Sequence, residues 1–274
     1  MAENSQMRAA VVGHVEWVEF IRVERVPEPD EIASAEESWE EAGGGGGVAA
    51  ARLAEHADET ILFTALGDDE RGHRALEQLE RLGVRMEVAW RSEPQRRAVV
   101  FLDGRGERAI TLVGERHAPR GEDALPWYEL GRVDAAYFTA GDREALEHAR
   151  DARVLVATAR ELALLSSSGT RLDGLVGSAS DEKESFVPAE LGPAPGLAIV
   201  TSGSLGGWAH PGGPFSAQPV PGPREDSYGC GDSFAAGLAF ALARGDAPDL
   251  AVQFAATWGA AALARRGALG RIAE

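Results

Sequence analysis

Several features are scarce in this sequence, and each absence excludes a class of protein. The 274-residue chain has one cysteine, Cys230, which excludes an internal disulfide and a metal site built from several cysteines. The longest apolar runs, such as residues 235–243, are far shorter than the about 18 residues of a membrane span. The amino-terminal segment has only Arg8 before a short apolar stretch, which does not match a signal peptide. We therefore expect a cytoplasmic protein without a membrane partner.

Basic residues are scarce as well, since 27 lysines and arginines face 44 aspartates and glutamates and leave a formal net charge of −17. No basic cluster is long enough to follow a phosphate backbone, which excludes nucleic acid as a partner. The sequence also lacks internal repeats and any linker that would separate two domains. With 44% apolar and 26% charged residues the composition is that of a globular protein, and we expect residues 1–274 to form a single domain.

Short apolar stretches alternate with helix-forming segments along most of the chain. The stretches expected as buried strands are residues 9–12, 60–66, 135–139, 153–157 and 197–201. The segments expected as helices are residues 48–54, 75–82, 143–150, 160–165, 233–244 and 250–265. Strands that alternate with helices connect by right-handed crossovers. The sequence therefore predicts an α/β fold of three layers, with a mostly parallel central sheet covered by helices on both faces.

Other strands alternate between apolar and polar residues and do not suit a sheet covered on both faces. Residues 15–23, 97–103 and 108–113 have this pattern, and Gly104-Arg105-Gly106 predicts a hairpin between the last two. We expect them to form a small β lid from segments roughly 14–42 and 91–113. Five consecutive glycines, residues 43–47, form a loop that opens a helix, without the Gly-Lys-Ser/Thr ending of a Walker phosphate loop.

The residues with the clearest chemistry are Gly229-Cys230-Gly231-Asp232, directly before the helix expected at residues 233–244. Glycines at the start of a helix leave the amides of its first turn free to bind an anion. The helix dipole favours an ionised carboxylate at Asp232 by about 0.3–1 kcal/mol. A carboxylate beside an anion hole suits phosphoryl transfer to an alcohol, in which it takes the hydroxyl proton. A helix-capping aspartate after a glycine turn is the competing interpretation.

The run from Asp226 to Phe234 resembles the signature D-x-x-G-A-G-D-x-F of the ribokinase-like (PfkB) family of carbohydrate kinases, with Cys230 in place of alanine. The resemblance covers most of the chain and implies the ribokinase-like fold and an ATP-dependent kinase that phosphorylates a hydroxyl of a sugar or sugar-like molecule. Further matching positions are Gly13, Pro27, Pro29, residues 49–53, Leu66-Gly67-Asp68-Asp69 with Gly72, Gly83-Val84, Thr201-x-Gly203-x-x-Gly206 and Arg266-Gly267-Ala268.

The resemblance implies roles for residues at the phosphate-transfer end of the site. Asp232 is the catalytic base and also contacts the acceptor, while Gly229, Cys230 and Gly231 supply the anion hole. These assignments belong to the family's motif and are carried over onto the matching positions of this sequence.

The nucleotide end is implied by a second group of residues. Thr201, Gly203 and Gly206 contact the phosphates or ribose of ATP, and the helix from residue 250 lies beside adenine, with Ala256 where the family has an asparagine. ATP and Mg²⁺ are the implied cofactors. Some members bind a monovalent cation through carbonyls near Gly267, and backbone ligation leaves no trace in a sequence.

The acceptor end departs from the family. Val18 occupies the position of the aspartate that binds sugar hydroxyls, and Glu16 is the candidate to replace it, with an exposed lid glutamate as the alternative. Gly43 and Gly44 are expected to contact the substrate, although the asparagine that follows the family's glycines is missing. The sequence therefore does not decide whether the acceptor is a sugar, a phosphosugar, a nucleoside or a cyclitol. A catalytically weak, nucleotide-binding homologue is the competing class.

Three further predictions concern charged and aromatic residues. The nearest equivalent of the family's Asn-x-x-Glu motif is residues 178–181, or Glu182 one position later. Asp181 is the candidate to hold Mg²⁺ indirectly, and a solvated acidic loop over residues 181–184 is the alternative. Arginines could bind a substrate phosphate or simply form surface pairs. Tryptophans on the lid could stack on a ligand or pack between two subunits, and by resemblance we expect a homodimer through the lid. These residues are Arg91, Arg96, Arg97, Trp17 and Trp39.

Overall fold

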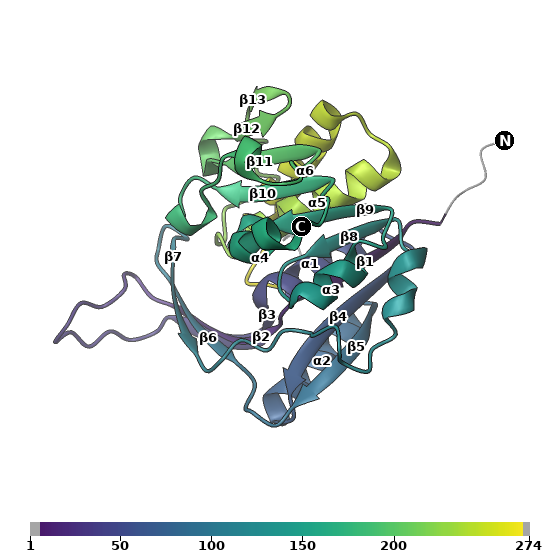
Figure 1. The fold of residues 1–274 in the computed structure, drawn as a ribbon. Coiled ribbons are helices and arrows are strands. Elements are labelled where there is room, and N and C mark those ends of the chain that lie inside the picture. Colours follow the sequence, from purple (N-terminus) through teal and green to yellow (C-terminus); the bar gives the residue numbers. More distant parts are fainter. Residues whose placement is uncertain (1–5, 271–274) are drawn as a thin grey trace.

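A nine-stranded sheet organises the computed structural model, which describes residues 6–270 (Figure 1). Seven neighbouring strands run parallel to one another. At one edge, two more strands join through antiparallel pairs, so the expected mostly parallel sheet is confirmed. From edge to edge the strands are β13 (Gly213–Phe215), β12 (Gly207–His210), β11 (Leu197–Thr201), β10 (Gly174–Ser178), β9 (Val154–Thr158), β8 (Ala135–Phe138), β1 (Arg8–Val12), β4 (Glu59–Gly67) and β5 (Val84–Arg91).

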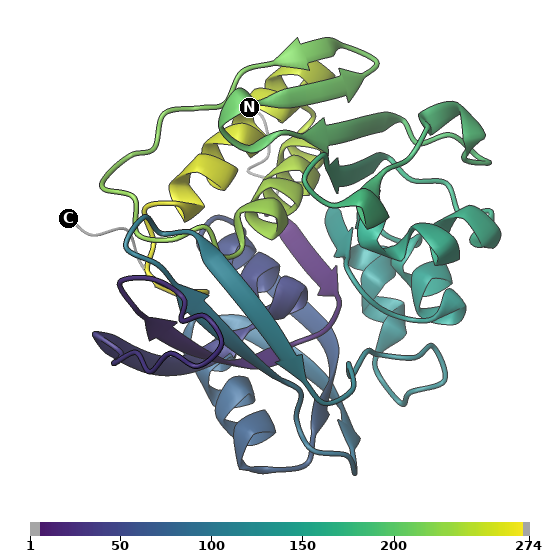
Figure 2. The same cartoon turned by 90° about the vertical axis from the view of Figure 1, so that its left-hand side faces the viewer.

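Helices cover both faces of this sheet because its central strands are apolar on both sides. In β1, for example, Ala9 and Val11 face one core while Ala10 and Val12 face the other. Figure 2 shows the two layers, with α5 and α6 in yellow-green and yellow and α3 in teal. The first layer contains α1 (Gly44–Ala54), α2 (Glu70–Arg81), α5 (Cys230–Arg244) and α6 (Pro248–Ala262). The second contains a 3-10 turn (Trp127–Arg132), α3 (Arg143–Ala149) and α4 (Leu162–Ser168).

A second, four-stranded sheet lies beside the first (Figure 1). Its order is β3 (Glu37–Gly43), β2 (Glu16–Arg22), β6 (Arg97–Leu102) and β7 (Arg108–Val113), with β2 and β6 parallel and the outer pairs antiparallel. It arises from the two segments expected to form a small β layer, and the predicted hairpin joins β6 to β7. One face, with Val18 and Phe20, packs on Tyr228 and Ala268 near the start of α5.

Some strands are not apparent from the sequence. The pattern of β3 is strongly acidic, and its residues up to Glu40 are mostly exposed, so it does not have the apolar content of a typical strand. The half-exposed edge strand β5 and the short strands β10, β12 and β13 were also not expected. Pairing with a neighbouring strand forms these elements, and that pairing depends on residues far away in the sequence.

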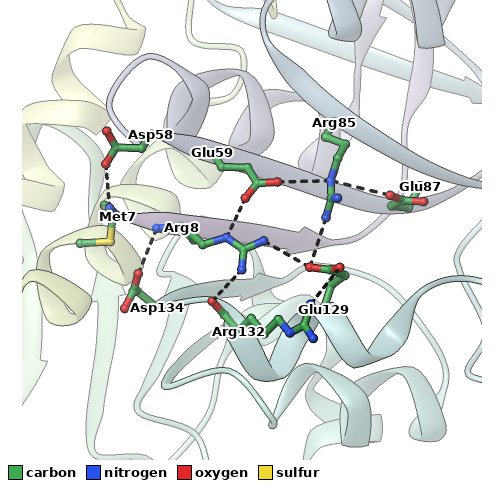
Figure 3. A network of polar contacts seen from close by, with 9 residues as sticks. All are labelled: Met7, Arg8, Asp58, Glu59, Arg85, Glu87, Glu129, Arg132 and Asp134. Atoms are coloured by element: carbon green, nitrogen blue, oxygen red, sulfur yellow. Dashed lines mark hydrogen bonds and ion pairs between the residues drawn. The ribbon is translucent and has the colours of Figure 1, made fainter. Parts of the chain in front are cut away.

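A polar network holds the amino ends of the central strands, at the edge of the sheet where β1 and β4 begin (Figure 3). Arg8 Nε donates to Glu59 Oε2 at 2.6 Å, and its Nη2 donates to Glu129 Oε2 at 3.2 Å. Arg85 of β5 reaches the same two carboxylates. Partly exposed ion pairs of this kind contribute about 0–1 kcal/mol each to the free energy of unfolding. The network therefore adds more to the alignment of these strands than to the stability of the protein.

Within residues 6–270, none of the helices combines the length and the apolar character that crossing a membrane requires.

Candidate active site

The first turn of α5 has the free amides that the sequence predicts. Gly229 precedes the helix with φ of 73°, in the left-handed region that favours glycine. A Cβ at this position would also lie only 2.7 Å from Val48 Cγ1, so both the backbone and the space favour glycine. Within residues 6–270, no hydrogen bond uses the amides of Gly229, Cys230 or Gly231. The turn is therefore able to bind an anion.

Asp232 lies in this first turn and is half-buried as a residue. The Tyr137 hydroxyl, from the end region of β8, donates to Asp232 Oδ1 at 3.1 Å. Burial raises the pKa of Asp232 above its ordinary value, while the charge of Arg160 and the Tyr137 hydrogen bond act in the opposite direction. The pKa of Asp232 is thus raised overall, whereas the helix dipole alone would lower it. A raised pKa brings a carboxylate closer to the range useful for proton transfer.

Arg160 and Glu184 flank Asp232. Arg160 follows β9, and its Nε donates to Glu184 Oε1 at 2.7 Å. Glu184 is buried, and burial raises its pKa, whereas the positive charge of Arg160 lowers it. The pair places a cation, balanced by a second carboxylate, next to the α5 turn.

Asp226, the first residue of the signature, is completely buried and works as a clamp. Its Oδ1 accepts the Tyr228 amide at 2.8 Å, and its Oδ2 accepts the Gly267 amide at 2.7 Å. The clamp joins the segment before α5 to the segment after α6. Arg108 of β7 also donates to the Ser227 carbonyl, which ties the second sheet to the same segment.

The glycine run differs from the predicted loop, because its residues belong to two regular elements. Gly43 ends β3, and Gly44, with φ of 75°, begins α1. The Gly44 amide donates to the Tyr228 hydroxyl at 3.0 Å, so it is not free for a substrate. Gly45 instead lies against Asp232, since a Cβ there would be 2.8 Å from Asp232 Oδ1. The amino ends of α1 and α5 thus meet at one carboxylate.

Glu16 faces the site, as its candidate role requires. It is buried, and Arg96 Nε lies 3.3 Å from its Oε1. Burial raises the pKa of Glu16, and Arg96 lowers it. His14 lies beside it and accepts the Gly45 amide at Nε2, at 3.4 Å. Val18, in the same strand, is buried in the core between the second sheet and Tyr228.

The nucleotide-end residues lie on β11, on its turn to β12 and near α6. Thr201 uses its hydroxyl to donate to the Gly177 carbonyl at 3.2 Å. Gly203 and Gly206 have positive φ, and a Cβ at Gly206 would lie 2.0 Å from the Phe215 carbonyl oxygen. Ala256 is buried in α6.

Gly267 also has positive φ, at 68°, and a Cβ there would lie 2.0 Å from Glu41 Oε1. Together with the Asp226 clamp, this brings the Gly267 segment next to the segment before α5.

Asp181 begins a 3-10 turn, Glu182–Glu184, where its Oδ1 accepts the Lys183 amide at 3.0 Å. The buried carboxylate of this acidic segment is Glu184 instead, next to Arg160 and within electrostatic reach of Asp232. In the described part of the chain, no three His, Cys, Asp or Glu side chains gather to hold a metal ion. A cation here would need phosphate oxygens or water among its ligands.

The three candidate arginines separate into different environments. Arg91 makes two hydrogen bonds to Asp123, at 2.8 and 2.7 Å, so it forms an ion pair, but a largely buried one rather than a surface pair. Arg97 lies opposite Trp17 in the β2–β6 ladder, on the other face from Val18. Only Arg96 reaches the site.

The two candidate tryptophans pack within the chain. Trp17 lies under the Arg74 guanidinium, and Trp39 stacks on Phe20, with ring centroids 4.9 Å apart.

Comparison with known proteins agrees with this geometry. Residues 6–152 and 136–272 match the family described as pfkB family carbohydrate kinase. The chain belongs to the PfkB family of carbohydrate kinases. The kinase is 29% identical to the ATP-dependent ribose-1-phosphate kinase of Halopiger xanaduensis, over 96% of this chain and 94% of that protein.

Solved structures support the fold of this kinase. A putative ribokinase from Agrobacterium tumefaciens superposes with a TM-score of 0.79 at 21% identity, covering 97% of this kinase and 94% of that chain. A ribokinase from Thermotoga maritima superposes with a TM-score of 0.73 at 20% identity, covering 96% and 95%. The ribokinase-like three-layer fold is therefore confirmed, and the family establishes the chain as a sugar kinase.

Several residues of the site were not singled out from the sequence as site residues. Tyr137 and Arg160 come from segments that carry no motif, whereas His14 follows the matching Gly13 and Glu184 lies in the acidic segment after Asp181. One signal was available, because the carboxyl ends of adjacent parallel strands meet at one edge, and His14 follows β1 while Arg160 follows β9. For Glu184 the signal was its place in the acidic segment that begins at Asp181.

Proposed function

We propose that this kinase transfers the γ-phosphate of ATP to a hydroxyl of a phosphorylated sugar, with ribose 1-phosphate as the first acceptor to test. The transfer step rests on the placement of Asp232 between two helix amino ends, beside three amides that have no acceptor among residues 6–270. The relative from Halopiger xanaduensis, named as an ATP-dependent ribose-1-phosphate kinase, suggests the donor and the acceptor.

In this proposal Asp232 accepts the proton of the attacking hydroxyl. The Tyr137 hydrogen bond holds Oδ1, which leaves the other carboxylate oxygen for the acceptor. Negative charge on the transferring phosphoryl group is met by the amides of Gly229, Cys230 and Gly231, and Arg160 adds a positive charge nearby. Burial raises the pKa of the Cys230 thiol to about 11, so Cys230 is neutral and contributes its amide.

The nucleotide would extend from the α5 turn towards the β11–β12 turn and α6. The glycines of that turn, Gly203 and Gly206, both have positive φ, which favours glycine, and Gly203 leaves open space beside it. Bound Mg²⁺ would supply charge neutralisation on the phosphates. Glu184, the buried carboxylate of the acidic segment, is better placed than Asp181 to support it through water.

The acceptor would lie on the other side of Asp232, against Glu16. A buried carboxylate that accepts two hydroxyl hydrogen bonds suits the neighbouring hydroxyls of a pentose. Nucleoside and cyclitol kinases of the same fold stay as alternatives, because Glu16 would bind their hydroxyls equally well.

An acceptor panel tests the proposal. The purified protein is incubated with Mg-ATP and ribose 1-phosphate, ribose 5-phosphate, ribose, adenosine or myo-inositol, and ADP release and product phosphorylation are followed by coupled assay and ³¹P NMR. We expect kcat/KM to be highest for a phosphorylated pentose. A preference for adenosine, myo-inositol or free ribose would contradict the assigned acceptor, and tight ATP binding without any transfer would indicate a non-catalytic homologue.

A further inference from the structure

The hydroxyl of Tyr228 is a buried donor that lacks an acceptor. Tyr228 is 8% exposed, and its hydroxyl oxygen accepts the Gly44 amide at 3.0 Å. A tyrosine hydroxyl can also donate one hydrogen bond. Among residues 6–270, none of the hydrogen bonds has this hydroxyl as its donor. A buried O–H group without an acceptor is destabilising, so the site leaves this donor for a ligand.

Several contacts hold the Tyr228 side chain in one place. The Tyr228 amide donates to Asp226 Oδ1 at 2.8 Å, and the ring meets Phe20 edge-on, with ring centroids 5.1 Å apart. The ring also packs in the apolar cluster between the second sheet and α5. A Cβ at Gly43 would lie 2.9 Å from the hydroxyl oxygen, so a larger residue there would displace it. The position of the hydroxyl is therefore fixed before a ligand binds.

This hydroxyl lies at the acceptor end of the site. Gly44, which donates to it, also lies against Glu16, since a Cβ at Gly44 would be 3.2 Å from Glu16 Cγ. The next residue, Gly45, lies against Asp232. The charges of Glu16 and Asp232 both act on Tyr228. The buried donor and the buried carboxylate thus flank the first turn of α1, one residue from the proposed base.

Tyr228 keeps its proton in this setting. Burial raises the pKa of Tyr228 above its ordinary value, and the negative charge of Glu16 raises it further, while the Gly44 hydrogen bond acts in the opposite direction. Tyr228 therefore offers a neutral O–H donor, whereas the ionised Glu16 carboxylate offers only acceptors. A ligand hydroxyl placed between the two side chains accepts from Tyr228 and donates to Glu16.

We propose that Tyr228 binds the acceptor by donating to a ring hydroxyl that itself donates to Glu16. The proposal rests on the proposed function and deepens it, because it makes a free, non-reacting hydroxyl a requirement of the acceptor. Tyr228 occupies a position that the family signature leaves open, so the signature does not predict this role. An analogue without the hydroxyl leaves a buried donor and a buried acceptor unpaired, and such sites discriminate strongly against it.

The test compares Tyr228→Phe with the wild type on ribose 1-phosphate and on its 2-deoxy and 3-deoxy analogues. For the wild type we expect kcat/KM to be at least about 100-fold lower for one of the two analogues. For Tyr228→Phe we expect kcat/KM for ribose 1-phosphate to fall about 10- to 100-fold, and kcat/KM for that analogue to change less than about threefold. Tyr128→Phe is the matched control, because Tyr128 is 67% exposed, and it should resemble the wild type.

The comparison of acceptors separates binding from a purely structural effect. Phenylalanine also leaves the Gly44 amide without its acceptor, and a shift of α1 would lower kcat/KM for every acceptor alike. Equal losses for ribose 1-phosphate and both analogues would overturn the proposal, because Tyr228 would then only hold α1. A wild type that phosphorylates both analogues as well as ribose 1-phosphate would overturn it too.

A double-mutant cycle tests whether one hydroxyl contacts both side chains. Glu16→Gln keeps the size of the side chain and removes its charge. If Tyr228 and Glu16 bind the same hydroxyl, the loss of kcat/KM in the double variant should be smaller than the product of the two separate losses. Losses that multiply would contradict a shared hydroxyl.

Binding without turnover distinguishes failure of this proposal from failure of the proposed reaction. Ribose 1-phosphate should raise the melting temperature of the wild type more than the weaker analogue does, and Tyr228→Phe should remove this difference. If the difference is seen and is lost in the variant, but no acceptor is phosphorylated, the reaction is wrong and the contact stands. If ribose 1-phosphate is phosphorylated and Tyr228→Phe keeps the wild-type preference, the reaction stands and the contact is wrong.

Discussion

At the scale of single residues, the carboxylate of Asp232 is subject to opposing effects. Removal from water raises its pKa, and the Tyr137 hydroxyl and the Arg160 charge lower it. A base must be ionised to accept a proton, so in the proposed mechanism the balance of these effects sets the lowest pH at which the kinase works. Of the groups that act on Asp232, Tyr137 can be changed without altering the packing around it, because phenylalanine fills the same space and lacks only the hydroxyl.

We predict that Tyr137→Phe moves the acid limb of the pH profile of kcat/KM to higher pH. The substitution removes a hydrogen bond that favours the ionised carboxylate, so the pKa of Asp232 rises further. The measurement is kcat/KM for the acceptor between pH 5 and 9 in both proteins. An unchanged acid limb, or one moved to lower pH, would show that Tyr137 does not hold the base.

Residue identities alone could predict part of this site. Asp232 and its three amides follow from a glycine-rich turn before a helix, which is a local pattern. The choice of Arg96 over Arg97 needed the strand ladder, because β6 begins at Arg97, which pairs with Trp17, and the residue directly before it faces the opposite side. The partners Tyr137 and His14 needed the order of strands in the sheet, which no local pattern encodes.

At the scale of elements, the site is built where the amino ends of α1 and α5 meet. The sequence shows five glycines but does not show that four of them form the first turn of α1. The structure gives the reason, because the turn passes too close to Asp232 and Thr139 for a side chain. At Gly45 a Cβ would lie 2.5 Å from Thr139 Oγ1, whereas at Gly47 the nearest atoms are 3.9 Å away.

Alanine at these two glycines should therefore give opposite results. Gly45→Ala forces Thr139 and Asp232 to shift, and we predict that kcat falls by about 10- to 100-fold and that stability falls by about 1–3 kcal/mol. Gly47→Ala meets no obstacle in a helix, and we predict unchanged kcat and a gain of about 0.5–1 kcal/mol. Urea denaturation and steady-state kinetics measure both. Similar losses in the two variants would mean that Gly45 has no special relation to Asp232.

At the scale of the whole molecule, the alternation of apolar strands and helices was sufficient to predict the three layers and the mostly parallel sheet. The acidic strand β3 and the edge strand β5 could not be predicted, because their polar side chains mask the pattern. The second sheet has one face packed towards Tyr228. Its other face has half-exposed apolar side chains, Ile21, Val99 and Phe101, that a partner would cover.

We predict that this outer face joins two copies of the chain into a homodimer. Light scattering after size-exclusion chromatography should give about twice the 28.9 kDa of one chain. Val99→Glu should shift the mass to that of a monomer, while the exposed substitution Arg71→Gln on α2 should not. A monomeric wild type at micromolar concentration would contradict the prediction.

The central claim is that Asp232 is the base that allows ATP to phosphorylate the acceptor. The most direct measurement is the turnover of Asp232→Asn with Mg-ATP and the best acceptor, together with its ATP affinity by calorimetry. We predict that kcat falls by about 10²- to 10⁴-fold while the ATP dissociation constant changes little, because the amides of the α5 turn are unaltered. A variant that keeps most of its turnover would contradict the account.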